Sequence, residues 1–244
     1  MDRWTLYELC VQSAPDVVAL LRRAHGGAAR TLAEDFAGSA AVSRAWVARG
    51  GRATAIDLDA GALERAARIE GLTTVCADVT ERTPAVSSAS DVVYVGNFSI
   101  LYLKQRERLL AYLRLARERL ASGGIFACDT YGGPAAFQLG AWRRERFLED
   151  GTRVVSTWEH RAADPATAQV ENVLHFRVER EGELLETFAD AFVYRWRLWS
   201  IAELADALRE VGFARHEVYA NIHDPLASPR ELDGDYSVCI VARG

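Results

Sequence analysis

The sequence predicts an α/β protein with a seven-stranded, mostly parallel sheet, helices on both faces of that sheet, and an antiparallel β insertion after the fifth strand. Short apolar runs alternate with helical patterns from about residue 29 to residue 129, which is typical of right-handed βαβ units. After Asp129 the alternation stops, and extended patterns follow before one more helix and two strands. The 244 residues, 50% of them apolar, are enough for a sizeable core.

The alternating region predicts five strands and three helices. The strands are expected at residues 31–36, 53–57, 74–77, 91–95 and 124–129. Apolar residues at three- and four-residue spacing predict the helices at residues 43–49, 61–69 and 106–120. Gly123 and Gly124 are expected to cap the last helix at its C-terminus.

The flanking segments complete the predicted order. Residues 6–24 have the periodicity of one or two amphipathic helices, broken near Pro15. Residues 131–134 predict a turn, and three extended segments of an antiparallel meander are expected at 152–158, 169–180 and 184–196. A helix at 201–211 and two strands at 214–219 and 236–242 end the pattern. The expected regions are an N-terminal helical cover (1–28), a core (29–133), an antiparallel cap (134–200) and the end of the core (201–244).

Composition and charge exclude several classes of protein. The formal charge is −5, and acidic and basic residues are interleaved, which disfavours a nucleic-acid surface. Apolar runs fall far short of the roughly 20 residues that span a bilayer, and residues 1–4 do not resemble a secretory signal, so a cytoplasmic protein without membrane segments is expected. The four dispersed cysteines favour reduced core thiols over disulfides or a metal site. Arg114, Arg117 and Arg119 favour a solvated helix face over a phosphate-binding patch.

Polar residues follow four successive predicted strands. A turn containing Gly38 comes after the first strand, and the N-terminus of a helix follows it, where open α/β sheets bind ligands. Asp57 ends the second strand about twenty residues later, where a carboxylate can accept hydrogen bonds from both hydroxyls of a ribose. Asp78 ends the third strand and can accept from an exocyclic amine, while Asn97 and Phe98 follow the fourth.

These features, over residues 31–129, resemble the ordered motifs of class I (Rossmann-like) S-adenosylmethionine-dependent methyltransferases of the small-molecule type. Glu34 matches the acidic residue that opens the family's glycine loop, Gly38 matches a loop glycine, and Ala40 stands where the family has another glycine. Residues 6–12 and 34–36 also resemble a bacterial subgroup of these enzymes. The resemblance implies S-adenosyl-L-methionine as cofactor. It implies that the cofactor is bound by Tyr7, Glu34, Phe36, Gly38, Asp57, Leu58, Asp78, Val79, Asn97 and Phe98, with Asp57 on the ribose, Leu58 against the adenine face, and Asp78 and Val79 at the adenine edge.

The resemblance also implies in-line methyl transfer to the nitrogen or oxygen of a small-molecule acceptor. The antiparallel insertion is similar to the segment that covers the acceptor in related enzymes, and a homodimerisation sheet is the alternative. An amine acceptor needs only to arrive neutral, whereas a hydroxyl needs a base. The candidate catalytic residues are His175, Tyr131 and Glu159, with Asp129 as a further candidate base. No compact acidic or histidine cluster favours a metal.

Two other functions fit parts of the pattern. An NAD(P)-dependent oxidoreductase would also use an acidic residue after the second strand, but the loop lacks the G-x-G-x-x-G pattern, and Glu34 beside it would repel a pyrophosphate. A non-catalytic protein that keeps the fold for ligand binding or dimerisation is consistent with Ala40 in the glycine loop.

Overall fold

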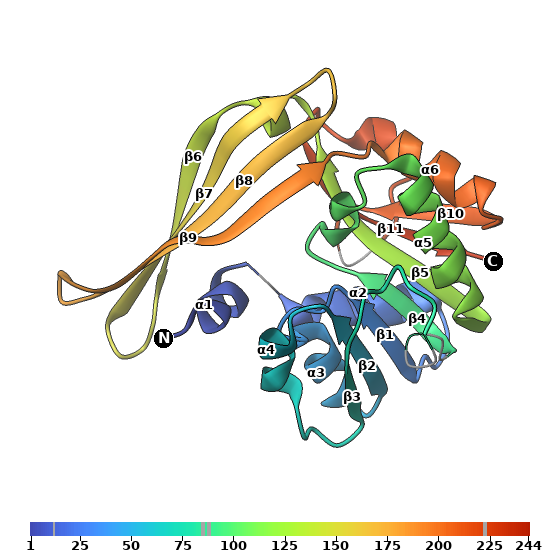
Figure 1. The fold of residues 1–244 in the computed structure, drawn as a ribbon, viewed down its shortest axis with the longest axis horizontal. Coiled ribbons are helices and arrows are strands. Elements are labelled where there is room, and N and C mark those ends of the chain that lie inside the picture. The colour runs from blue at the N-terminus through green and yellow to red at the C-terminus, as the bar shows by residue number, and fades with distance from the viewer. Residues whose placement is uncertain (12, 84–85, 87–88, 222–223) are drawn as a thin grey trace. The chain divides into compact units, whose positions relative to one another are not determined.

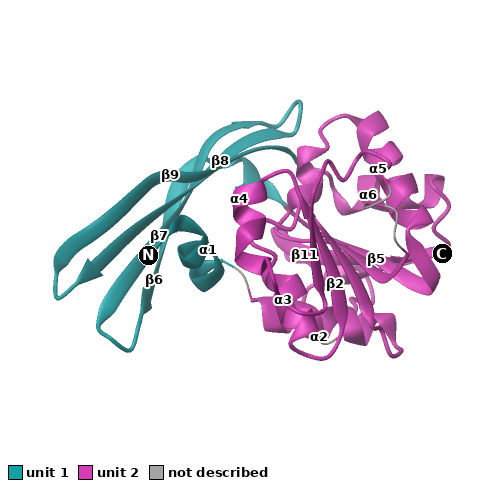
Figure 2. Cartoon of the chain, turned by 60° about the horizontal axis from the view of Figure 1, so that its bottom comes forward, with its two compact units in different colours: residues 1–12, 132–198 teal, residues 13–131, 199–244 magenta. Residues whose placement is uncertain are grey.

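The structure is a computed structural model that describes residues 1–11, 13–83, 86, 89–221 and 224–244, so Gln12 of the N-terminal motif lies outside the described residues. The chain divides into two compact units (Figure 2). The β unit consists of residues 1–12 and 132–198, and the α/β unit consists of residues 13–131 and 199–244. None of the helices in the described ranges has the length and apolar character that a membrane span requires.

Seven strands of the described residues form the sheet of the α/β unit, in the order β10-β11-β5-β4-β1-β2-β3 (Figure 1). They are β1 (Thr31–Asp35), β2 (Arg52–Asp57), β3 (Leu72–Cys76), β4 (Ser90–Val95), β5 (Leu120–Gly132), β10 (Arg215–Tyr219) and β11 (Tyr236–Arg243). The pairs β3–β2, β2–β1, β1–β4 and β4–β5 are parallel, and β10–β11 is antiparallel. The predicted mostly parallel sheet is confirmed.

Helices cover both faces of this sheet. They are α2 (Ala14–His25), α3 (Ala41–Val47), α4 (Ala60–Leu63), α5 (Arg106–Glu118) and α6 (Ile201–Glu210), with short 3-10 turns η1 (Glu64–Ala66), η2 (Ser99–Tyr102) and η4 (Pro229–Glu231). Successive side chains of a strand point to opposite faces. Leu32 of β1 therefore packs in one core with residues of α2 and α3, whereas Asp35 bonds to Tyr112 of α5 on the other face.

One prediction about the end of α5 is wrong, and another holds for only two of its three residues. The helix ends at Glu118 with Arg119 as its C-cap, and Gly123 and Gly124 lie in β5, at a bulge opposite β4. Arg114 and Arg117 are exposed, as predicted for a solvated helix face, but Arg119 is 2% exposed and forms a buried ion pair with Asp35. The helical spacing of the arginines could not show this, because the ion-pair partner lies 84 residues away in the sequence.

The β unit contains α1 (Arg3–Cys10), the 3-10 turn η3 (Pro134–Phe137) and a four-stranded sheet with the order β6-β7-β8-β9 among the described residues. Its strands are β6 (Gly140–Phe147), β7 (Thr152–Asp164), β8 (Gln169–Arg180) and β9 (Glu183–Arg197), and every neighbouring pair is antiparallel. The predicted insertion is confirmed, although β6 was not predicted. All eight residues of this edge strand are exposed, so the alternation of apolar and polar residues that signals a half-buried strand is missing.

The N-terminal segment forms two helices with a break near Pro15, as predicted. The helix α1 ends at Cys10, and α2 begins at Ala14 with Pro15 in its first turn, where a missing N–H is tolerated. In the β unit, the rings of Trp4 and Tyr7 from α1 pack on Phe192 of β9, at centroid distances of 4.9 and 5.0 Å.

Candidate functional site

The loop between β1 and α3 is tightly wound. Phe36, Gly38 and Ala40 all have left-handed backbone conformations, with φ of 54°, 52° and 55°. Glycine adopts this region without steric cost, whereas residues with a Cβ are disfavoured there. The loop therefore reverses sharply while keeping the peptide groups around Gly38 close to the end of β2.

Asp57 ties the end of β2 to this loop. Its Oδ2 accepts a hydrogen bond from the backbone N–H of Gly38 at 2.7 Å, and its Oδ1 accepts one from the N–H of Asp59 at 2.8 Å. Each carboxylate oxygen keeps a further lone pair. Asp59 caps α4 by accepting from the N–H of Ala62, as its position predicts. Asp57 thus remains a carboxylate that can accept two hydroxyl groups of a ligand.

Glu34 lies beneath the loop and is only 3% exposed. Its Oε2 accepts hydrogen bonds from the N–H of Ser43 at 2.7 Å and from the Ser43 hydroxyl at 2.5 Å, which anchors the first turn of α3. Burial raises the pKa of Glu34 to about 7, and the Ser43 bonds act in the opposite direction. The side chain orders the loop from below, and its predicted contact with a cofactor stays a prediction.

Asp35 follows on the opposite face of β1 and is fully buried. Its two oxygens accept from both terminal nitrogens of Arg119, at 2.8 and 2.9 Å, and Oδ2 also accepts from the Tyr112 hydroxyl at 2.6 Å. Phe36 packs its ring against Tyr112 at 6.0 Å and against Tyr102 at 6.4 Å. Two adjacent carboxylates therefore hold the loop from both sides of the sheet, and the sequence did not reveal the Asp35 half of this arrangement.

Asp78 and Leu58 stand near the ends of β3 and β2. Oδ1 of Asp78 accepts from the N–H and hydroxyl of Thr80, at 2.8 and 2.7 Å, while its Oδ2 accepts no hydrogen bond from the described residues. Leu58 is 68% exposed, which is unusual for a leucine that directly follows a buried strand. Val79 is buried. This part of the edge offers an open apolar side chain and one uncommitted carboxylate oxygen.

The ends of β4 and β5 meet through Asp129. Its Oδ2 accepts from the Tyr94 hydroxyl at 2.6 Å and from the N–H of Asn97 at 3.1 Å, and burial raises the pKa of this carboxyl. Asn97 and Phe98 are both left-handed, with φ of 51° and 62°. The ring of Phe98 packs on that of Tyr131 at 4.8 Å. The candidate base Asp129 is therefore already committed to holding this corner.

In the β unit, His175 and Glu159 form a pair that the sequence spacing did not identify. Nε2 of His175 lies 2.9 Å from Oε2 of Glu159, and the N–H of Asp190 donates to Nδ1 at 3.0 Å. Because Nδ1 accepts, the ring proton is on Nε2 and is donated to Glu159. Asp190 lies in a bulge of β9 with φ of 50°, and Arg161 binds both Glu159 and Asp190.

The predicted site residues fall into two groups. The α/β unit carries ten of them at the carboxyl ends of its parallel strands, called here the carboxyl edge: Glu34, Phe36, Gly38, Asp57, Leu58, Asp78, Val79, Asn97, Phe98 and Tyr131. The β unit carries Tyr7, Glu159 and His175.

Four cysteines are free thiols; Cys128 and Cys239 are buried as predicted, but Cys76 is exposed. Within the described ranges, no three potential metal ligands gather in one place.

Comparisons with known proteins place the fold. No protein-family model and no curated sequence matches the chain. Among solved structures, the S-adenosylmethionine-bound amino pentose methyltransferase CalS10 from Micromonospora echinaspora superposes with a TM-score of 0.74 at 17% identity, covering 99% of this chain and 96% of that one. The chain has the class I methyltransferase fold.

Two further structures share this methyltransferase fold. An S-adenosylmethionine-dependent methyltransferase from Clostridium acetobutylicum superposes with a TM-score of 0.74 at 15% identity, covering 98% of this chain and 96% of that one. DesVI from Streptomyces venezuelae gives a TM-score of 0.72 at 20% identity, with 94% and 89% covered. The methyltransferase fold that the motifs implied is confirmed, including the antiparallel insertion.

Proposed function

We propose that the chain is an S-adenosylmethionine-dependent methyltransferase that acts on a small-molecule acceptor. The observation that carries the proposal is the contact between Asp57 and the Gly38 loop, at 2.7 Å, on the carboxyl edge of a methyltransferase fold. A carboxylate with open lone pairs beside a glycine turn and a helix N-terminus is the combination that suits a nucleoside with an attached polar chain. The structural neighbours are described as enzymes that use this cofactor.

The residues of the carboxyl edge fit S-adenosylmethionine part by part. Asp57 would accept from the two ribose hydroxyls, using the lone pairs that Gly38 and Asp59 leave open. The exposed side chain of Leu58 would cover the adenine face, which explains why 68% of it is open. Oδ2 of Asp78 would accept from the adenine amino group.

The other end of the cofactor would lie against the β1–α3 loop. Backbone N–H groups at a helix N-terminus favour a carboxylate, and the left-handed loop presents them around Gly38. Ala40 keeps the left-handed conformation of the family's glycine, with φ of 55°, and is fully buried. Its Cβ therefore points into the protein core, so the substitution does not by itself block the loop.

The cofactor, when bound, supplies a methyl group on a positively charged sulfur, which is an excellent leaving group. The chain's own contribution is to hold the acceptor in line and to exclude water, and positioning of this kind can contribute several kcal/mol to catalysis. Phe98 and Tyr131 pack together at the end of β4 and β5 and provide an apolar wall for this purpose. Asp129 fixes that wall through Tyr94 and Asn97.

We infer further that the acceptor atom is an amine nitrogen. A hydroxyl acceptor needs a base, whereas the candidate bases already serve other donors: Nδ1 of His175 accepts from the N–H of Asp190, and Asp129 accepts from the Tyr94 hydroxyl, the Asn97 N–H and the Cys239 thiol. A neutral amine needs no base before transfer. CalS10 is described as an amino pentose methyltransferase, and KedS8 from Streptoalloteichus as a sugar N-methyltransferase. Residues 134–200, all but the last two of which lie in the β unit, are proposed to select the acceptor.

The sheet topology disfavours the oxidoreductase alternative. Dinucleotide-binding sheets of the Rossmann type are typically parallel in the order 3-2-1-4-5-6. Here β11 is inserted between β5 and β10 and pairs antiparallel with β10. Equilibrium dialysis against radiolabelled S-adenosylmethionine and NADH tests this choice directly. Saturable binding of NADH, with none of S-adenosylmethionine, would overturn the proposed function.

Turnover separates an enzyme from a binding protein. The purified chain is incubated with methyl-labelled S-adenosylmethionine and a panel of amino sugars, each paired with the hydroxyl sugar of the same configuration. Label is expected in the amino compounds alone. Transfer to the hydroxyl partners would contradict the amine assignment, and tight cofactor binding without any transfer, including to a bacterial metabolite extract, would support the non-catalytic alternative.

A further inference from the structure

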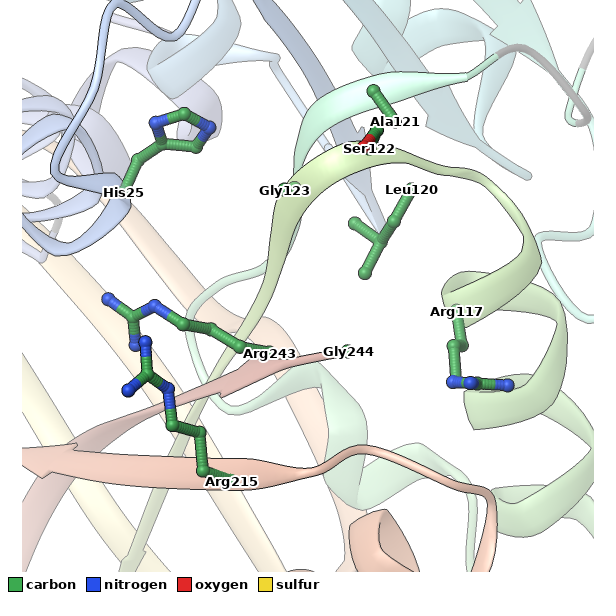
Figure 3. A pocket seen from close by; sticks show the side chains of 10 residues that line it. His25, Arg117, Leu120, Ala121, Ser122, Gly123, Arg215, Arg243 and Gly244 are labelled. Atoms are coloured by element: carbon green, nitrogen blue, oxygen red, sulfur yellow. The ribbon is translucent and has the colours of Figure 1, made fainter.

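The α/β unit has a hollow of about 660 Å³ at the end of the sheet opposite the carboxyl edge (Figure 3). It lies where β5 begins at Leu120, where β10 begins and where β11 ends. Leu120 lies opposite Ser90 and Cys128 lies opposite Val95, and β4 rises roughly 16 Å between these two positions, at about 3.3 Å per residue. The hollow is therefore distinct from the proposed cofactor site, and it has the size of a small-molecule pocket.

The lining of this hollow is strongly cationic. Three arginines, Arg117, Arg215 and Arg243, line it together with His25, and no acidic side chain of the described residues does. Arg243 donates to Glu217 at 2.7 Å, so its charge is partly balanced. The guanidinium groups of Arg117 and Arg215 form no ion pair or hydrogen bond with any described residue. Two uncompensated guanidinium groups therefore border one cavity.

Arg215 and Arg243 are directly opposite each other in the β10–β11 ladder. Like charges at directly opposed positions of an antiparallel pair are destabilising. Figure 3 shows their guanidinium groups turned toward one another at the rim of the hollow, below His25. A bound anion between them would convert this repulsion into a favourable arrangement.

The β5 bulge forms the facing wall. The register with β4 passes from Ser90–Leu120 directly to Val92–Ile125, so four residues of β5 oppose Asp91 alone. Residues in a bulge lack ladder partners, which leaves peptide N–H groups for other acceptors. A Cβ on Gly124 would lie 2.9 Å from the Ala121 carbonyl oxygen, so the bulge depends on glycine at this position. The wall is a built feature of the fold rather than a loose loop.

We propose that this hollow binds the phosphate group of a small phosphorylated molecule. Guanidinium forks match phosphate oxygens with paired hydrogen bonds. A phosphate monoester carries up to two negative charges, which matches the two uncompensated arginines better than the single charge of a carboxylate. The site is separate from methyl transfer and does not depend on the proposed function.

The proposal is tested by calorimetric titration of the full chain with inorganic phosphate, pyrophosphate and malonate at constant ionic strength. Phosphate and pyrophosphate are expected to bind saturably and more tightly than malonate. The double variant Arg117→Gln/Arg215→Gln should weaken that binding by about tenfold or more. The control Arg114→Gln removes one positive charge, where the double variant removes two, from an exposed position one turn earlier on α5, and its affinity should stay within about twofold of the wild type.

Three results would overturn the proposal. They are the absence of saturable phosphate binding, tighter binding of malonate than of phosphate, and equal weakening by Arg114→Gln and by the double variant. Thermal unfolding without phosphate checks that the variants are folded, which is expected because Arg117 and Arg215 are exposed.

Discussion

Replacing Glu34 with glutamine should change how the stability of the protein depends on pH. Burial raises the pKa of Glu34 from 4.5 to about 7 in the folded state. A shift of one pKa unit corresponds to 1.36 kcal/mol, so ionising this group in the folded protein costs about 3 kcal/mol. Because the folded pKa is the higher one, the contribution of Glu34 to stability is complete below pH 4.5 and is lost as the pH rises through 7.

Glu34→Gln removes the charge and keeps an acceptor for Ser43. Urea unfolding of the variant and the wild type across this range gives the difference in their free energies of unfolding, in which other titrating groups cancel. That difference should move by about 3 kcal/mol in favour of the variant between pH 4.5 and about pH 8. Glu107→Gln, at an exposed position, should change by less than about 0.5 kcal/mol. A difference that stays constant with pH, or that moves against the variant, would refute the reasoning.

Three further predictions concern single side chains. Arg119→Met leaves the buried Asp35 without its ion-pair partner, so urea unfolding should show a loss of about 3 to 5 kcal/mol; Asp35→Leu added to it should recover part of the loss, and an additive further loss would contradict the pairing. Gly96→Ala places a Cβ 2.7 Å from the Tyr94 ring and should lower the free energy of unfolding by about 1 to 3 kcal/mol, whereas an unchanged value would contradict that packing. His175→Ala should reduce acceptor turnover while S-adenosylmethionine affinity stays within about twofold, or roughly 0.5 kcal/mol; normal turnover with loss of a dimer on gel filtration would instead make this segment an interface.

The parallel strands and the closing antiparallel pair could be predicted because each is a buried apolar run that ends in polar or turn residues. That signal also located the carboxyl edge, since parallel strands end together. β6 carries no such signal, because every one of its residues is exposed. The sequence pattern likewise describes neighbours along the chain but not partners across it, so the Asp35–Arg119 ion pair and the Tyr94–Asp129 hydrogen bond emerge only from the structure.

In the candidate site, too, some features could be predicted from the sequence and others only emerge from the structure. Residue type and position were enough to select Asp57 and Asp78 as candidates, because each carboxylate follows a parallel strand at the edge where open α/β sheets bind ligands. Residue type and position did not show that the Glu34 side chain lies beneath the loop and accepts from Ser43. The residues next to Glu34 in the sequence would be the same if its side chain faced a ligand instead. Nor could residue type and position show that both nitrogens of His175 are engaged, which depends on a bulge in another strand.

The most direct test of the central claim is the affinity of S-adenosylmethionine for the wild type, for Asp57→Ala and for Asp59→Ala, measured by calorimetric titration. Loss of a hydrogen bond to a charged group costs about 1.5 to 3 kcal/mol, so Asp57→Ala should bind at least about tenfold more weakly. Asp59→Ala removes the same charge and a helix cap two residues away, and its affinity should stay close to that of the wild type. Equal affinity of the Asp57 variant and the wild type would contradict the account.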